Sequence, residues 1–144
     1  MKKLILIFFV CGSWNLMEAG NKPNTNSWSV KIGKKEKLSS WANNKFGDLI
    51  TLRLKEIRND DTLYAGGFLC GYSFSGVKVE TTFEIKNEKG DYIAGTKIEN
   101  GGFDMQIPLT TLLKFKEFRN GDTLIFTLWA DKMKVVSWKM KLVC

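Results

Sequence analysis

The sequence predicts an all-β fold: an antiparallel two-sheet sandwich of about seven or eight strands, immunoglobulin-like or fibronectin-like in arrangement. Past residue 27, apolar and polar residues alternate with a period of two in one short segment after another, as in half-buried strands. Turn-forming residues separate these segments at intervals of about eight to twelve residues. Glycine is frequent (13 residues) and proline is rare (2 residues), which favours turns between strands over a helical bundle.

Each expected strand has one apolar face, and the turns between strands are recognisable. The cleanest alternation runs through residues 77–86, where the second face is charged. Asn100-Gly101 is typical of a two-residue hairpin loop, and Asp131-Lys132 is the expected turn of the last hairpin. Residues 109–119 lack a clear period, and we expect one short helical turn there. The residues expected to face the core are Trp28, Val30, Ile32, Ile50, Leu52, Leu54, Val77, Val79, Thr81, Phe83, Ile85, Val136, Trp138, Met140 and Leu142.

Two cysteines of the domain are expected to point toward the core. In the segment 62–74, the aromatic residues Tyr64 and Phe68 share parity with Cys70, which predicts that all three face inward. Cys144 shares the apolar parity of the last strand. Cys70 and Cys144 are therefore the candidate disulfide, since an even pair of cysteines commonly bonds in an oxidising compartment. Two free, buried cysteines are the alternative.

The first twenty residues have the pattern of a secretion signal. Lys2 and Lys3 form a positively charged start, an apolar stretch covers residues 4–10, and small and polar residues follow. The apolar stretch is too short to cross a bilayer, which takes about twenty residues. We expect residues 1–20 to be the signal peptide and residues 21–144 to form a single β-sandwich domain.

The position of signal cleavage decides whether the domain is soluble or tethered. We expect the cut between residues 11 and 20. Cys11 stands directly after the apolar stretch, as the lipid-modified cysteine of a lipoprotein does, so Cys11 is the candidate lipidation site. The residue before it, Val10, is bulky where such signals prefer a small side chain, so a soluble periplasmic or outer-surface domain stays open beside a lipid-anchored one.

The charge of the chain bears on its partners. The net charge is +7, and removing residues 1–20 leaves +6, because that segment carries two lysines and one glutamate. A basic cytosolic domain would suggest nucleic acid. Export removes that partner and favours a protein or glycan of the cell envelope, with a membrane reached only through a lipid anchor on Cys11.

The composition argues against an enzyme. The chain has no histidine, the commonest general base and transition-metal ligand. Pairs of carboxylates such as Glu80 and Glu84 alternate with apolar residues, as on a solvated strand. We expect no catalytic residue, no metal ligand and no cofactor.

A few surface residues are candidates for binding. Trp129 has the opposite parity to Leu124, Phe126 and Leu128. If that face is exposed to solvent, its flat aromatic ring can hold a sugar or a protein, and otherwise Trp129 belongs to the core. Lys139 and Lys141 form a basic row on the last strand. Lysines of this kind either face an anion or discourage strand-to-strand aggregation.

Together these observations favour a non-enzymatic binding or accessory module of a bacterial cell envelope, which engages a protein or a glycan through a sheet face or edge. The alternative is a periplasmic inhibitor or immunity protein that blocks a toxin or a hydrolase.

Overall fold

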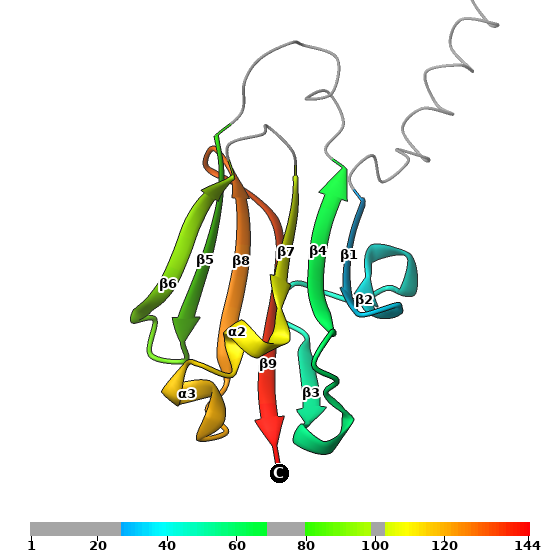
Figure 1. Ribbon diagram of the computed structural model, residues 1–144. Coiled ribbons are helices and arrows are strands. Elements are labelled where there is room, and N and C mark those ends of the chain that lie inside the picture. The colour runs from blue at the N-terminus through cyan, green and yellow to red at the C-terminus, as the bar shows by residue number, and fades with distance from the viewer. Residues whose placement is uncertain (1–26, 69–79, 99–102) are drawn as a thin grey trace, which may run out of the picture.

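The computed structural model describes residues 27–68, 80–98 and 103–144, and two β-sheets make up most of this part of the chain (Figure 1). Its strands are β1 (Ser27–Ile32), β2 (Lys35–Ser39), β3 (Leu49–Arg53), β4 (Thr62–Phe68), β5 (Thr81–Asn87), β6 (Tyr92–Ile98), β7 (Asp104–Pro108), β8 (Leu124–Ala130) and β9 (Met133–Val143). Its short helices are η1 (Ser40–Ala42), η2 (Leu54–Glu56), α2 (Leu109–Leu112) and α3 (Lys116–Arg119). The predicted all-β, sandwich-like class is confirmed.

The two sheets have four and five strands. The four-stranded sheet has the order β2-β1-β4-β7, and the five-stranded sheet has the order β3-β9-β8-β5-β6. Neighbouring strands are antiparallel with one exception: β3 runs parallel to β9, with Ile50 beside Met140 and Leu52 beside Leu142. The prediction of purely antiparallel pairing is therefore wrong at this edge. In that register the buried side chains of β3 lie beside the buried side chains of β9, so both strands contribute to one core.

The core lies between the sheets and centres on three aromatic rings. Trp138 is fully buried and stacks on Phe126, with ring centroids 5.2 Å apart, and on Phe83 at 6.4 Å. In the inward rows predicted for β1, β3, β5 and β9, the described residues are buried with one exception, which confirms the period-two reading of these four strands. Leu54 is the exception, because β3 ends at Arg53 and Leu54 begins the exposed helix η2. Val77 and Val79 lie outside the described residues.

The inward prediction for the aromatic residues of β4 is wrong. Leu63 and Ala65 are buried, whereas Tyr64 and Phe68 lie on the outer face. The spacing between the sheets gives the reason. A Cβ added at Gly67 would lie 2.7 Å from Cγ1 of Val135 on β9, so this inward row of β4 has room only for small side chains near its end.

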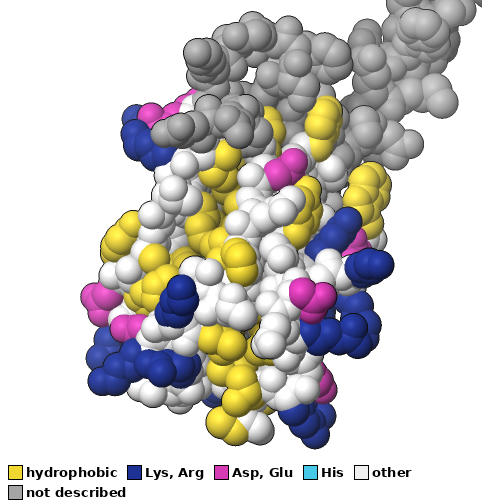
Figure 2. All heavy atoms as spheres, viewed as in Figure 1, with side chains coloured by type: hydrophobic (Ala, Val, Ile, Leu, Met, Phe, Trp, Pro, Cys, Tyr) yellow, Lys and Arg dark blue, Asp and Glu magenta, His cyan; other side chains and the backbone are white. Residues whose placement is uncertain are grey.

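Residues 109–119 form two short helices where one helical turn was predicted. Leu109, Leu112 and Phe118 are buried, and the helices α2 and α3 lie at the same end of the sandwich as the C-terminus (Figure 1). Apolar side chains also gather on the side of the molecule between the edge strands β6 and β7 (Figure 2). The core thus extends past the sheets on this side, where Ile98 and Ile107 are half-buried.

The predictions for the last hairpin and for the cysteines have different outcomes. The predicted turn at Asp131-Lys132 is confirmed, with Asp131 at φ 53° between β8 and β9. Cys144 is exposed and not inward-facing, because β9 ends one residue before it. Cys70, Cys11, the signal segment and Asn100-Gly101 lie outside the described residues, so the disulfide, the lipidation and that hairpin stay predictions. Across the ranges that the structure describes, no helix is long and apolar enough to cross a membrane.

Candidate functional site

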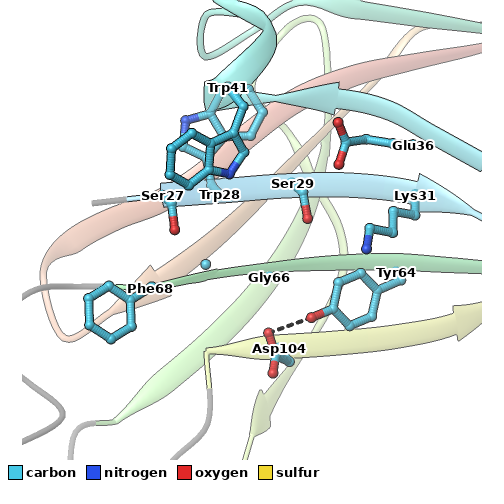
Figure 3. Close-up of a pocket in the computed structure, with 11 residues that line it drawn as sticks. Ser27, Trp28, Ser29, Lys31, Glu36, Trp41, Tyr64, Gly66, Phe68 and Asp104 are labelled. Carbon is cyan, nitrogen blue, oxygen red and sulfur yellow. Dashed lines mark hydrogen bonds between the residues drawn. The ribbon is translucent and has the colours of Figure 1, made fainter. Parts of the chain in front are cut away.

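A groove of about 270 Å³ runs over the outer face of the four-stranded sheet (Figure 3). It crosses β1 and β4 and reaches β2 and β7 at its sides, so the β1-β2 hairpin and two strands distant from it in sequence contribute to it. The residues that line it are Ser27, Trp28, Ser29, Lys31, Glu36, Trp41, Tyr64, Gly66, Gly67, Phe68 and Asp104.

Small residues form the floor of the groove. Ser29 of β1, Gly66 of β4 and Asp104 of β7 are neighbours across three strands. A Cβ at Gly66 would collide with the carboxylate of Asp104 and would lie 2.8 Å from the hydroxyl of Tyr64. The glycine is therefore required for the neighbouring side chains to meet over this part of β4, and it leaves the sheet surface hollow.

Two exposed aromatic rings stand at one end of the floor. The side chain of Trp41 is 80% exposed and that of Phe68 is 46% exposed, and they lie on either side of Ser27 (Figure 3). Exposed large apolar side chains clustered at a concave surface commonly mark a binding site. The rings supply flat apolar surface on which a ligand can stack.

The backbone beneath Trp41 is fixed although its ring is exposed. The helix η1 is capped by Ser39, whose Oγ accepts a hydrogen bond from the amide of Ala42 at 3.3 Å. The amide of Trp28 donates to Oγ of Ser40 at 3.2 Å, which ties η1 to β1. Little backbone ordering is therefore needed before the Trp41 ring can contact a ligand.

The opposite end of the groove is polar. The hydroxyl of Tyr64 donates to Oδ1 of Asp104 at 2.8 Å, and Nζ of Lys31 lies 5.7 Å from the centroid of the Tyr64 ring. Glu36 of β2 pairs with Lys31 in register. Two carboxylates and one ammonium therefore border the groove, which gives this site a net negative charge in a basic protein.

Burial and the adjacent Asp104 raise the pKa of Tyr64 to about 12. Burial contributes most, and the hydrogen bond to the carboxylate and its negative charge add to it, because each disfavours the phenolate. The phenol is therefore a neutral hydrogen-bond donor at physiological pH. It keeps the Asp104 carboxylate oriented beside the groove floor.

The residues predicted from the sequence lie elsewhere. Trp129, Lys139 and Lys141 occupy the outer face of the five-stranded sheet, which confirms the outward prediction for the two lysines and excludes the core position for Trp129. The indole NH of Trp129 donates to Oε1 of Glu84 at 2.8 Å, and Nζ of Lys134 lies 5.4 Å from the ring centroid. The polar atom of Trp129 and one side of its ring are thus already engaged within the protein.

Sequence reasoning missed the rings of Trp41, Phe68 and Tyr64. One signal was present for Trp41: it stands in the polar, turn-rich segment 39–44, where a tryptophan has no apolar neighbours with which to enter a core. The signal in β4 was ambiguous, because Leu63 and Ala65 alternate with Tyr64 and Phe68 and either set could face inward.

The described residues offer no obvious metal chemistry, since no group of three or more His, Cys, Asp or Glu side chains among them could hold a metal ion. Comparison with models of protein families, with curated proteins and with solved structures finds no significant match to this chain. The geometry of the groove is therefore the basis for a functional proposal.

Proposed function

We propose that this protein is an exported, non-enzymatic binding module of a bacterial cell envelope, and that it holds a glycan in the groove on its four-stranded sheet. The observation that carries the proposal is Trp41: a ring that is 80% exposed, on a fixed backbone, at the rim of a hollow lined with hydroxyls and carboxylates. The domain would present this groove through an immunoglobulin-like or fibronectin-like sandwich.

The chemistry of the lining suits a sugar. A sugar ring has apolar C–H faces and a rim of hydroxyls, so it needs flat apolar surface and hydrogen-bonding groups together. Trp41 and Phe68 supply the surface, and the hydroxyls of Ser27 and Ser29 supply both donors and acceptors. The carboxylate of Asp104 accepts hydrogen bonds and repels anions. A neutral or amino-sugar chain therefore fits better than an acidic one.

We expect the groove to hold part of a longer glycan and not to enclose a whole ligand. At about 270 Å³ it is smaller than the roughly 300–1,000 Å³ pockets that enclose drug-sized ligands. A short stretch of an extended chain could lie along the floor, with the rest of the polymer in solvent.

Binding to an array of neutral and amino-sugar oligosaccharides tests this proposal. We expect Trp41→Ala and Phe68→Ala each to weaken glycan binding by about tenfold or more, in line with the loss of an aromatic anchor. Tyr92→Ala is the matched control, because Tyr92 is 64% exposed on the other sheet and lies outside the groove. Its glycan affinity should equal that of the wild type.

Three results would contradict the proposal. Absence of binding to every glycan on the array would remove the ligand class. An equal loss of affinity for Trp41→Ala and Tyr92→Ala would remove the site. Stoichiometric inhibition of an envelope hydrolase, abolished by Trp41→Ala, would favour the inhibitor hypothesis and assign the groove to a protein.

Export and anchoring are tested by mass. We expect protein recovered from membrane and soluble fractions to lack the signal segment, with the new N-terminus between residues 11 and 21. A chain that begins at lipid-modified Cys11 would establish the tethered form. An unprocessed Met1 in both fractions would overturn export. Thiol alkylation under denaturing, non-reducing conditions tests the Cys70–Cys144 pair, because bonded cysteines would gain no mass.

A further inference from the structure

The outer face of the five-stranded sheet is a second surface with its own chemistry, which we call the lysine face. It is defined by the outward-pointing lysines of β5, β6 and β9 together with the apolar side chains beside them. The lysines are Lys86, Lys97, Lys134, Lys139 and Lys141, and the neighbouring side chains are Leu49, Tyr92 and Trp129. We infer that the lysine face docks on the surface of an anionic lipid bilayer.

The register of the strands puts these side chains on one side of the sheet. On β9, the buried Trp138, Met140 and Leu142 alternate with Lys139 and Lys141. Lys97 of β6 pairs with Thr82 of β5. Thr82 is next to the buried Phe83 and points to the other side of the sheet, so Lys97 points outward as well. With five strands about 4.8 Å apart, the face spans about 20 Å.

The charge of the lysine face is unbalanced. Five lysines share the face with two carboxylates, Glu80 and Glu84. Arg53 of β3 adds a sixth cation, which pairs with Glu56 at 3.8 Å. Glu80 pairs with Lys97 at 3.0 Å and Glu84 pairs with Lys86 at 3.1 Å.

Among the residues that the structure describes, the remaining three lysines have no carboxylate partner. Lys134 lies over the ring of Trp129, and Lys139 and Lys141 have no ion pair with any residue in the described ranges. Three positive charges are left over, and each lysine near an anionic bilayer surface favours association by about fivefold. Together they amount to a preference of about a hundredfold for an anionic bilayer over a zwitterionic one.

The apolar side chains of the face point to a bilayer. Tyr92 is 64% exposed on the edge strand β6, and Leu49 is 51% exposed on the opposite edge strand β3. Tyrosine and tryptophan favour the headgroup region, where an apolar ring meets a polar boundary. The lysines thus lie between two exposed apolar edges, an arrangement that matches headgroups with acyl chains beneath them.

The identity of the cations argues against a protein partner. Protein interfaces are depleted in lysine and enriched in arginine, whose planar fork binds a carboxylate in two places. Five of the six cations on this face are lysine, a flexible point charge suited to a diffuse layer of headgroups, and the sixth, Arg53 of β3, pairs with Glu56 at 3.8 Å. Bilayer docking would leave the groove free, because the groove lies on the outer face of the other sheet.

Vesicle partitioning tests the inference. The protein is purified after export with Cys11→Ser in every sample, so that no lipid anchor contributes. Vesicles of phosphatidylcholine alone are compared with vesicles that also contain phosphatidylglycerol. We expect binding to the anionic vesicles only, lost at high salt because screening weakens surface electrostatics.

Two double variants with equal charge change separate the face from the overall charge. Lys139→Gln with Lys141→Gln should lower partitioning by about thirtyfold. Lys35→Gln with Lys37→Gln changes two exposed lysines of β2, on the other sheet, and should lower it by less than about threefold. Thermal unfolding of both variants establishes that each is folded.

Several results would overturn the inference: no binding to anionic vesicles, equal losses for the two double variants, or no loss for the Lys139 and Lys141 variant. Retention on an acidic polysaccharide without vesicle binding would also overturn it and would assign the face to an acidic polymer. Glycan binding through the groove is measured separately, so failure here leaves the proposed function standing.

Discussion

The two outer faces of the sandwich are built on the same pleated backbone and differ in the size of the side chains that cover it. The outer face of the four-stranded sheet carries serines and a glycine between aromatic rings, and it is hollow. The outer face of the five-stranded sheet carries lysines and Trp129, and the short side chains between them are shielded from solvent. Thr127 and Ser137 on that face are only 5% exposed.

Each outer face has a tyrosine side chain that lies over a glycine, so the two faces can be compared at the same kind of position. Tyr64 reaches over Gly66 to bond Asp104, and Tyr92 lies over Gly95. The first pair borders a groove, whereas the second belongs to an exposed edge strand. In this protein, the position of small residues relative to long ones therefore decides which sheet face is hollow enough to receive a ligand.

Exchange of these glycines for alanine should have the largest effect. A Cβ at Gly95 would lie 2.5 Å from the carbonyl oxygen of Phe83, so Gly95→Ala should lower the free energy of unfolding by about 1–3 kcal/mol. Gly66→Ala should lower it by about 1–2 kcal/mol, since the crowded atoms are side-chain ends that can move. Denaturant unfolding measures both.

Ligand binding separates the same two variants. Only Gly66→Ala should weaken glycan binding, by about tenfold, because it displaces Tyr64 and Asp104 from the groove. Equal glycan affinity in the two variants would break the distinction between the faces.

The buried hydroxyl pair of the lysine face should have the next largest effect. Oγ1 of Thr127 and Oγ of Ser137 are 3.1 Å apart. Thr127→Val leaves the Ser137 hydroxyl buried without a partner and should cost about 1–2 kcal/mol of unfolding free energy. Adding Ser137→Ala should restore part of that loss, because no unpaired hydroxyl remains. Strictly additive losses in this double-mutant cycle would show that the pair is not coupled.

Neutralising one carboxylate should change membrane docking more than stability. Glu84→Gln keeps an acceptor for the Trp129 indole and removes one negative charge from the lysine face. We expect partitioning to anionic vesicles to rise by about fivefold, with a stability loss below about 1 kcal/mol. Glu36→Gln makes the same charge change beside the groove and is the control. If Glu36→Gln raised vesicle partitioning as much as Glu84→Gln, the result would contradict docking through the lysine face.

The smallest expected effect is the pH dependence of Tyr64. Its pKa is about 12 in the folded protein and 10.0 in the reference state, so the unfolded chain loses this proton first. The contribution of Tyr64 is therefore complete below pH 10 and declines as the pH rises toward 12.

Thermal unfolding of the wild type and Tyr64→Phe across that range measures the difference, since the lysines titrate equally in both. The stability gap should narrow as the pH rises. Asp104→Asn should bring the Tyr64 titration closer to 10.0, because the negative charge is lost. A gap that widens with pH would contradict the arrangement of Tyr64 and Asp104.

The fold class and most of the core can be predicted from the sequence. Period-two alternation is a local consequence of strand geometry, so it identified the buried row of β9 around Trp138 and the outward position of Lys139 without knowledge of the neighbours. The same rule placed Trp129 on the opposite face to Phe126. The turn at Asp131 was also readable, because turn residues act through their own backbone.

The other features depend on contacts between segments that are distant in sequence. Alternation separates the two faces of a strand but does not show which face is buried when both carry apolar residues, as in β4. There the close approach of Val135 to Gly67 leaves room only for small side chains on the inner face. The parallel pairing of β3 with β9 depends on which strand of the other sheet the chain joins after it leaves the four-stranded sheet. The groove depends on Trp41, Gly66 and Asp104, which come from three distant segments. Side-chain size is encoded locally, but a hollow forms only where the sheet brings small residues side by side.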